Sequence, residues 1–287
     1  MRCRSGGKGV IGARAGVANC TRQGAAPCSG LPEPRDADGV RPSGAGQAVQ
    51  NAAVPRFIVC IPGRALAALL IAVLAAHAAA QVPPSAAEVA RYIGLHEAAQ
   101  RGDARRIDTI LAAGADLDAR DAHGRTALHV ATFARRHDAI RQLARAGADL
   151  GALENDRYDA VTIAAVADDE ETLRLLLALC ASARLVTSRY DGTALIAAAH
   201  LGHDGVVRQL IAAGAPLDHV NNLHWTALIE SIVLGDGGAR HVATLQALLD
   251  AGASTALTDR DGRTPLALAR GRGYAQMVQL LEAAGAR

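Results

Sequence analysis

The stretch Asp259-Arg260-Asp261-Gly262-Arg263-Thr264-Pro265-Leu266-Ala267 decides the fold of this 287-residue chain. Thr264 can cap a helix through its hydroxyl, and Pro265 suits the first helical position, where no backbone N–H is needed. Residues 121–129 repeat the same pattern closely. Shorter versions occupy residues 191–195 and 225–228. The recurrence predicts that the chain is built from one small helical unit used several times.

A glycine recurs after these copies at a nearly fixed interval. It follows short apolar runs at Gly114, Gly147, Gly214, Gly252 and Gly285, which are separated by 33, 67, 38 and 33 residues. Glycine suits the left-handed end of a helix because it has no Cβ. A period of this length predicts an array of stacked units, each a helix, a turn and a second helix, followed by a polar connection.

These residues resemble ankyrin repeats, through Thr264-Pro265-Leu266 and through Gly-Ala-Asp endings such as residues 147–149. The resemblance covers residues 90–287. It implies an all-α solenoid of about six helix–turn–helix units, joined by short β-hairpins that project as fingers. The units are expected to start near Ile93, Thr126, Ala160, Thr193, Thr226 and Thr264.

Two units depart from the pattern. In the third, Ala160 stands where Thr is expected, Thr162 where a core Leu is expected, and Cys180 near the helix-ending glycine. The fifth carries about five extra residues, which we expect between its two helices at residues 235–239. In the regular units a leucine follows the cap by two residues and is predicted to point into the core. These leucines are Leu128, Leu195, Leu228 and Leu266.

The N-terminal part of the chain differs from the array. Residues 1–55 are rich in Gly, Pro, Ala, Ser and Arg, which predicts a disordered leader or a misassigned start. Within residues 56–80, Arg56 and Arg64 precede a short apolar run, and small residues follow up to Ala80. This order is typical of a secretory signal peptide.

Cleavage after Ala80 would release the mature chain into the periplasm or the medium. An uncleaved membrane anchor is the alternative, and a later start at Val54 or Val59 would place the signal at the beginning of the protein. Residues 81–89 are expected to be a short linker. The membrane is then a partner only in transit, through the signal segment.

Charge limits the class of partner. Residues 81–287 carry 21 Arg, no Lys and 25 Asp or Glu, a net charge of −4. A surface that binds nucleic acid should be clearly basic, so we expect none as a partner. No catalytic motif is found, and we expect neither an enzyme nor a cofactor. His200 and His203 leave a metal or small-ligand binder as an alternative, although this Gly-His turn is common in the family the chain resembles.

Aromatic residues are scarce in the array and gather near three successive fingers. Tyr158, Tyr190 and Trp225 fall just before the starts of consecutive units. Trp, Tyr and Arg dominate binding energy at protein interfaces. We therefore predict a protein-binding edge, with polar neighbours as its rim. The candidate binding residues are Arg157, Tyr158, Arg189, Tyr190, Asn222, His224 and Trp225.

The sequence thus predicts a monomeric, exported scaffold that binds another protein, in the bacterial periplasm, without catalysis. A secreted effector or a toxin-neutralising protein is the alternative within the same class. The pattern carries no information on the identity of the partner, because recognition is grafted onto a fold residue by residue.

Overall fold

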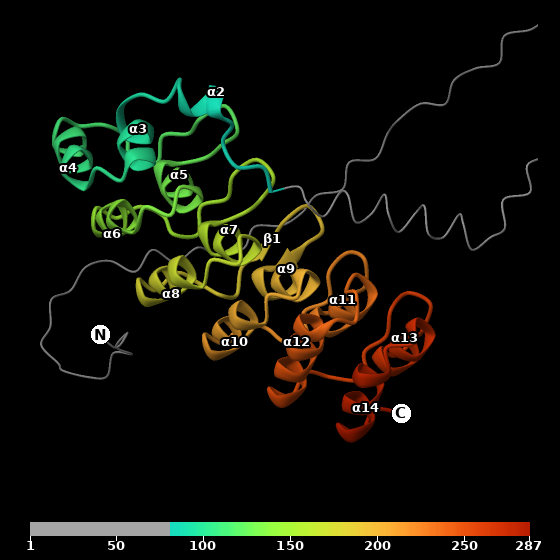
Figure 1. The fold of residues 1–287 in the computed structure, drawn as a ribbon. Coiled ribbons are helices and arrows are strands. Elements are labelled where there is room, and N and C mark those ends of the chain that lie inside the picture. The colour runs from blue at the N-terminus through green and yellow to red at the C-terminus, as the bar shows by residue number, and fades with distance from the viewer. Residues whose placement is uncertain (1–80) are drawn as a thin grey trace, which may run out of the picture. The chain divides into compact units, whose positions relative to one another are not determined.

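The computed structural model describes residues 81–287, which form one helical array (Figure 1). The predicted leader and the predicted signal segment lie outside the described residues. Among residues 81–287, no helix is both long and apolar enough to cross a lipid bilayer.

Twelve helices alternate in six pairs. The first helices of the pairs are α3 (Gly94–Arg101), α5 (Ala127–Phe133), α7 (Ala160–Val166), α9 (Ala194–Leu201), α11 (Ala227–Val233) and α13 (Pro265–Arg272). The second helices are α4 (Ala104–Ala112), α6 (His137–Arg145), α8 (Glu170–Ala178), α10 (Asp204–Ala212), α12 (Ala239–Asp250) and α14 (Ala275–Ala283).

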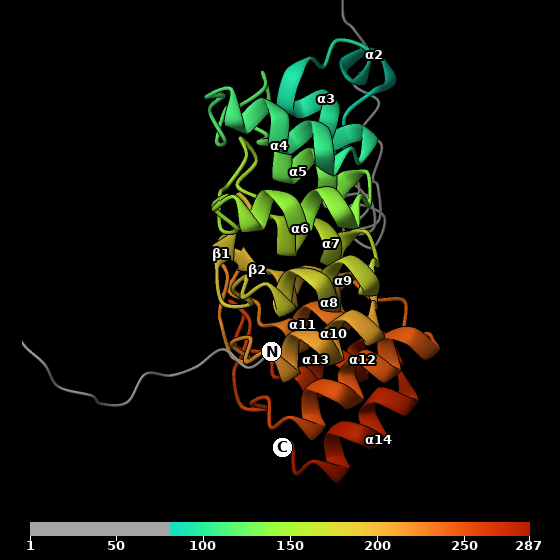
Figure 2. The same cartoon turned by 90° about the vertical axis from the view of Figure 1, so that its left-hand side faces the viewer.

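The first helices stack in one row and the second helices in another, while the connecting hairpins run along one edge (Figure 2). The core lies between the two rows. The four leucines predicted to be buried are at most 3% exposed, and Leu143 and Leu210 on the second helices are fully buried. Each helix is too short to be stable alone, so burial against neighbouring units holds the array together. The predicted all-α solenoid of six units is confirmed.

Side-chain caps begin most of the first helices. The hydroxyls of Thr193, Thr226 and Thr264 each accept a hydrogen bond from a backbone N–H in the first turn, at 3.2–3.3 Å. In the third unit the cap is Asp159, whose carboxylate accepts from the N–H of Thr162 at 2.8 Å. The predicted start at Ala160 was therefore wrong by one residue. Because aspartate caps helices as well as threonine does, the unit needs no threonine there.

This shift changes the roles of the neighbouring residues in the third unit. Val161, not Thr162, takes the place of the core leucine, and it is fully buried. Thr162 takes the place of His129 and lies 3.1 Å from the hydroxyl of Thr187. Cys180 adopts the left-handed φ of 69° at the helix end, where the other units have glycine.

The extra residues of the fifth unit were expected between its helices, and this was only partly right. Helix α11 ends at Val233 and α12 begins at Ala239, but α12 has 12 residues where its counterparts have 9. The insertion therefore lengthens the second helix as well as the turn. The turn is held by the hydroxyl of Tyr274, which donates to the carbonyl of Gly235 at 2.8 Å.

The hairpins are joined to one another by main-chain hydrogen bonds. One hairpin contains two short antiparallel strands, β1 (Val186–Thr187) and β2 (Gly192–Thr193). A backbone N–H of one hairpin donates to a carbonyl of the hairpin before it, at 2.9–3.0 Å, at each of three successive joints. These bonds are Asn155 to His123, Ser188 to Arg157 and Asn222 to Tyr190. The hairpins of the second to fifth units therefore form one continuous strip.

Histidines that follow the core leucine on the first helices bond across to the hairpins. The Nε2 of His96 lies 2.9 Å from the carbonyl oxygen of Arg125. His129 makes the same kind of link further along the array. At the N-terminal end, the predicted linker contains a four-residue helix, α2 (Ala86–Val89), capped by Ser85.

Candidate functional site

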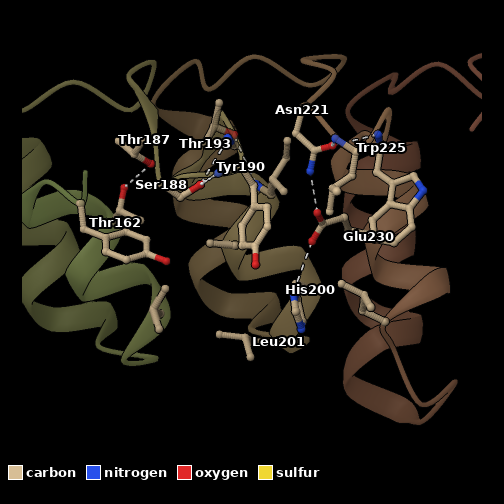
Figure 3. Close-up of a pocket in the computed structure, with 17 residues that line it drawn as sticks. Thr162, Thr187, Ser188, Tyr190, Thr193, His200, Leu201, Asn221, Trp225 and Glu230 are labelled. Carbon is tan, nitrogen blue, oxygen red and sulfur yellow. Dashed lines mark hydrogen bonds and ion pairs between the residues drawn. The ribbon is translucent and has the colours of Figure 1, made fainter. Parts of the chain in front are cut away.

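A recess opens where the hairpins of the third to fifth units meet helices α7, α9 and α11 (Figure 3). It contains about 720 Å³ of space, part of it open to solvent. Its walls are mostly apolar, with a few polar groups at the base. The residues that matter for its chemistry are Tyr158, Tyr190, His200, Asn221, Trp225 and Glu230.

Each hairpin is shaped by one side-chain oxygen near its start. In the fifth unit the Oδ1 of Asn221 accepts from the backbone N–H of Leu223 at 3.0 Å and of Trp225 at 2.9 Å. Asp121, Glu154, Ser188 and Asp259 do the same in the other hairpins. The hairpin geometry is thus set locally, and it fixes the direction of the residue immediately before each helix cap.

That residue is arginine in the second and sixth units. The Nε of Arg125 donates to Asp121 at 2.7 Å, and the Nε of Arg263 donates to Asp259 at 2.8 Å. Burial opposes ionisation of Asp121, but hydrogen bonds from Arg125 outweigh it and hold the pKa of Asp121 below its usual value. In the units between, the position is held by Tyr158, Gly192 and Trp225. The recess therefore lies beside the three units that have an aromatic residue or a glycine, instead of arginine, immediately before the helix cap.

The three predicted aromatic residues come together in this recess, although not from equivalent positions. Tyr158 and Trp225 each stand one residue before a cap, as expected, but Tyr190 stands three residues before Thr193. It lines the recess beside Gly192, which has no side chain. Tyr158 is only 8% exposed, while Tyr190 and Trp225 are half-buried.

A carboxylate lies between the rings of Tyr190 and Trp225 (Figure 3). Glu230 is on α11 and is 5% exposed. Its Oε1 accepts a hydrogen bond from the Nδ2 of Asn221 at 2.7 Å, and its Oε2 lies 3.4 Å from the Nδ1 of His200. The base of the recess is therefore an acidic group held by a neutral amide and a histidine.

Glu230 is a candidate functional residue that reasoning from the sequence missed. It stands four residues after the cap, where the first unit has Glu97 and the remaining units have the apolar residues Val130, Ile163, Ala197 and Leu268. A charged residue at a position that is apolar in four of the other five units was the available signal. Buried carboxylates are rare unless they are paired, so this position marks the site.

The other predicted binding residues lie along the fingertips. Arg157 donates to Asp191 at 2.9 Å, Arg189 pairs with Asp156, and the Nδ2 of Asn222 donates to the carbonyl of Arg189 at 3.0 Å. These three side chains thus connect neighbouring fingers. His224 is exposed and holds a left-handed φ of 63°.

The two histidines considered for metal binding do not converge. His200 contacts Glu230 on α11, whereas the Nδ1 of His203 lies 2.9 Å from the carbonyl oxygen of Ala165 on α7. Within residues 81–287, no group of three or more His, Cys, Asp or Glu side chains is placed to hold a metal ion. The acidic run at residues 168–171 has a structural place, because Asp169 caps α8 through the N–H of Thr172.

Comparisons with known proteins place the array among repeat proteins. A family model described as ankyrin repeats, in three copies, matches residues 95–187 and again residues 163–259. The ankyrin repeat protein YahD of Escherichia coli K12 is 39% identical over 190 residues, which is 66% of this chain and 94% of YahD.

Solved structures agree with these matches. The ankyrin repeat domain ABAYE2397 of Acinetobacter baumannii AYE is 45% identical, with a TM-score of 0.63 over 67% of this chain and 98% of that domain. A chain in the complex of the predatory endopeptidase Bd0816 of Bdellovibrio bacteriovorus with immunity protein Bd3460 is 22% identical, with a TM-score of 0.56 over 67% of this chain and 98% of that one. The last likeness shows the fold alone.

Proposed function

The chain belongs to the ankyrin repeat family, and we propose that it binds one partner protein through the recess between its third and fifth units. Ankyrin repeats are general scaffolds for protein–protein interaction. The observation that carries the proposal is the meeting of Tyr158, Tyr190 and Trp225 in one concave site. Aromatic anchors in a pocket are the usual source of binding energy at protein interfaces.

The stiffness of the array supports this function. Main-chain hydrogen bonds join the hairpins around the recess, and ion pairs join Arg157 to Asp191 and Arg189 to Asp156. A site that is already ordered loses less entropy when it binds. The proposed mechanism is rigid presentation of the recess and the fingertips beside it, with no catalytic step.

Quantitative capture tests this proposal. The full-length chain is used as bait in extracts of its own cells, in parallel with the Tyr190→Ala/Trp225→Ala double variant. Loss of two half-buried anchors should weaken a true complex by more than about 2 kcal/mol, or roughly thirtyfold. Ile93→Ala is the matched control, because Ile93 is 80% exposed and lies at the far end of the array. Equal recovery of every protein by bait and double variant would refute the proposal.

We further propose that the mature array acts outside the cytoplasm. The support is the order of Arg56, Arg64, a short apolar run and small residues up to Ala80 in the sequence. The test is expression with a C-terminal tag in a bacterial host, followed by fractionation and N-terminal sequencing. A periplasmic product that begins at Gln81 would support export. A cytoplasmic product that retains residues 56–80 would refute it.

A further inference from the structure

We infer that the recess takes a lysine or arginine side chain of the partner protein, with Glu230 as its counter-ion and Tyr190 and Trp225 as its flanking walls. This inference rests on the proposed protein-binding function and specifies the chemistry of the same site. Three observations support it: the charge at the base of the recess, the buried arginine that the second unit has in place of Trp225, and the chemistry of the walls.

The charge at the base is incompletely balanced within the chain. The side chain of Glu230 is 7% exposed, and His200 is the one group among residues 81–287 that forms an ion pair with it. The contact is long, at 3.4 Å, and it is ionic only when the imidazole carries a second proton. Asn221, the other partner, is neutral. A buried carboxylate is costly unless a positive charge compensates it, so a cation from outside would be stabilised here.

The second unit shows how the chain pairs a buried cation at the position immediately before a helix cap. Arg125 precedes the cap of α5, as Trp225 precedes the cap of α11. The Arg125 side chain is 3% exposed and lies between Glu88 at 2.6 Å and Asp121 at 2.7 Å. Tyr92 completes this cluster by donating its hydroxyl hydrogen to Asp121 at 2.8 Å.

The fifth unit lacks both the arginine and the hairpin aspartate of the second unit, and its carboxylate comes from another position. Trp225 stands in place of Arg125, Asn221 in place of Asp121, and Glu230 supplies an acid from the helix. The amide of Asn221 can donate to Glu230, which an aspartate could not do. The arrangement therefore holds the carboxylate in position while leaving its charge for a ligand.

The walls favour an organic cation over other occupants. Tyr and Trp rings attract ammonium and guanidinium groups through their negative faces, and Glu230 lies between Tyr190 and Trp225 (Figure 3). The aliphatic stem of lysine or arginine would contact the apolar wall, which includes Ile196 and Leu234. An anionic side chain would be repelled by Glu230. An apolar side chain would remove water from the carboxylate and offer nothing in exchange.

Trp225 is the single tryptophan of the chain, so its indole resonance reports on the recess directly. The full-length protein is titrated with N-acetyl-lysinamide, N-acetyl-argininamide and the neutral isostere N-acetyl-norleucinamide, and the indole N–H signal is followed by NMR. We expect a saturable shift with at least one cationic probe, and binding at least about tenfold weaker with the neutral isostere. No saturable shift with either cation, or equal binding of the isostere, would overturn the inference.

Variants separate charge from structure. Glu230→Leu introduces an apolar residue, as found at this position in four of the other five units, and should fold at least as well. It should nevertheless weaken binding of the cationic probe at least about tenfold. Glu230→Gln keeps the size of the side chain and should also weaken binding of the cationic probe at least about tenfold. It provides the test if the leucine variant does not fold. Glu170→Gln is the control, because Glu170 lies on α8 and is half exposed. Retention of binding by both Glu230 variants would overturn the inference.

The same variants distinguish this inference from the proposed function. Suppose that the double aromatic variant loses a partner in the capture experiment while Glu230→Gln and Glu230→Leu retain it. The recess then binds protein without a cation, and only the present inference fails. If the aromatic variant also retains every partner, the proposed function fails with it.

Discussion

The stability of the array should fall in mild acid, because His129 is buried in its neutral form. The ring is 0% exposed. Its Nε2–H donates to the carbonyl oxygens of Ala152 at 3.0 Å and Tyr158 at 3.2 Å, and its Nδ1 accepts from the backbone N–H of Thr126 at 3.1 Å. Burial lowers the pKa of His129 from 6.5 to about 4.

The sign and the size follow from linkage. Between pH 6.5 and 4 the unfolded chain binds a proton at this histidine that the folded chain does not bind, so the free energy of unfolding decreases as the pH falls. One pKa unit corresponds to about 1.4 kcal/mol. The shift therefore predicts a loss of about 3 kcal/mol by pH 4, and no contribution from His129 above pH 7.

His129→Gln isolates this contribution. Glutamine does not titrate, and at this position it can still contact the N–H of the capping residue Thr126. Urea denaturation is followed by far-UV circular dichroism and by the fluorescence of Trp225, at several pH values from 7.5 to 4. The free energy of unfolding of the wild type, minus that of the variant, should fall by about 3 kcal/mol from pH 7.5 to pH 4.

Asp159 makes this comparison necessary. Burial raises the pKa of Asp159, so its contribution has the opposite sign: it favours the folded chain as the pH falls. The contribution is common to both proteins and cancels in their difference. If wild type and His129→Gln show parallel pH profiles, the histidine does not titrate as described and the reasoning is refuted.

Three further predictions concern stability and can be measured by urea denaturation at neutral pH. Leu195→Ala should cost about 2–5 kcal/mol because Leu195 is fully buried; a loss below about 0.5 kcal/mol would mean that the site relaxes completely. His224→Gly should raise stability by up to about 1 kcal/mol, since glycine accepts the left-handed conformation without strain, and a decrease would contradict this. Arg125→Met should cost about 2 kcal/mol or more because it leaves two carboxylates without their buried cation. The exposed counterpart change Arg263→Met should cost less than about 1 kcal/mol, and equal losses would contradict the role of burial.

Much of the fold was predictable because its signals are local. The cap Thr264, the helix-ending glycines and the core leucines each act within one or two turns of chain, so a single sequence displays them. The start of the third unit was placed wrongly because Asp159 and Ala160 are adjacent and both spacings fit the period. Only the hydrogen bond from Thr162 to the Asp159 carboxylate separates the two choices.

The site was predictable only in part, because it is assembled from different units. The scarcity of aromatic residues pointed to Tyr190 and Trp225, but not to the fact that Tyr190 reaches the recess from another position beside Gly192. Glu230 was missed because its partners are 9 residues away at Asn221 and on the preceding unit at His200. Such contacts depend on the stacking of units and are not written in any one of them.

The main-chain bonds between successive hairpins have a mechanical consequence. Three successive joints repeat the same short link, from Asn155 to His123, from Ser188 to Arg157 and from Asn222 to Tyr190, and each of these bonds joins only two adjacent hairpins. Under tension from its two ends, the array should first extend elastically while these bonds hold. The joints should then break one at a time, in small force steps. A partner seated across the third to fifth units would clamp the middle joints and shift the first rupture towards the ends.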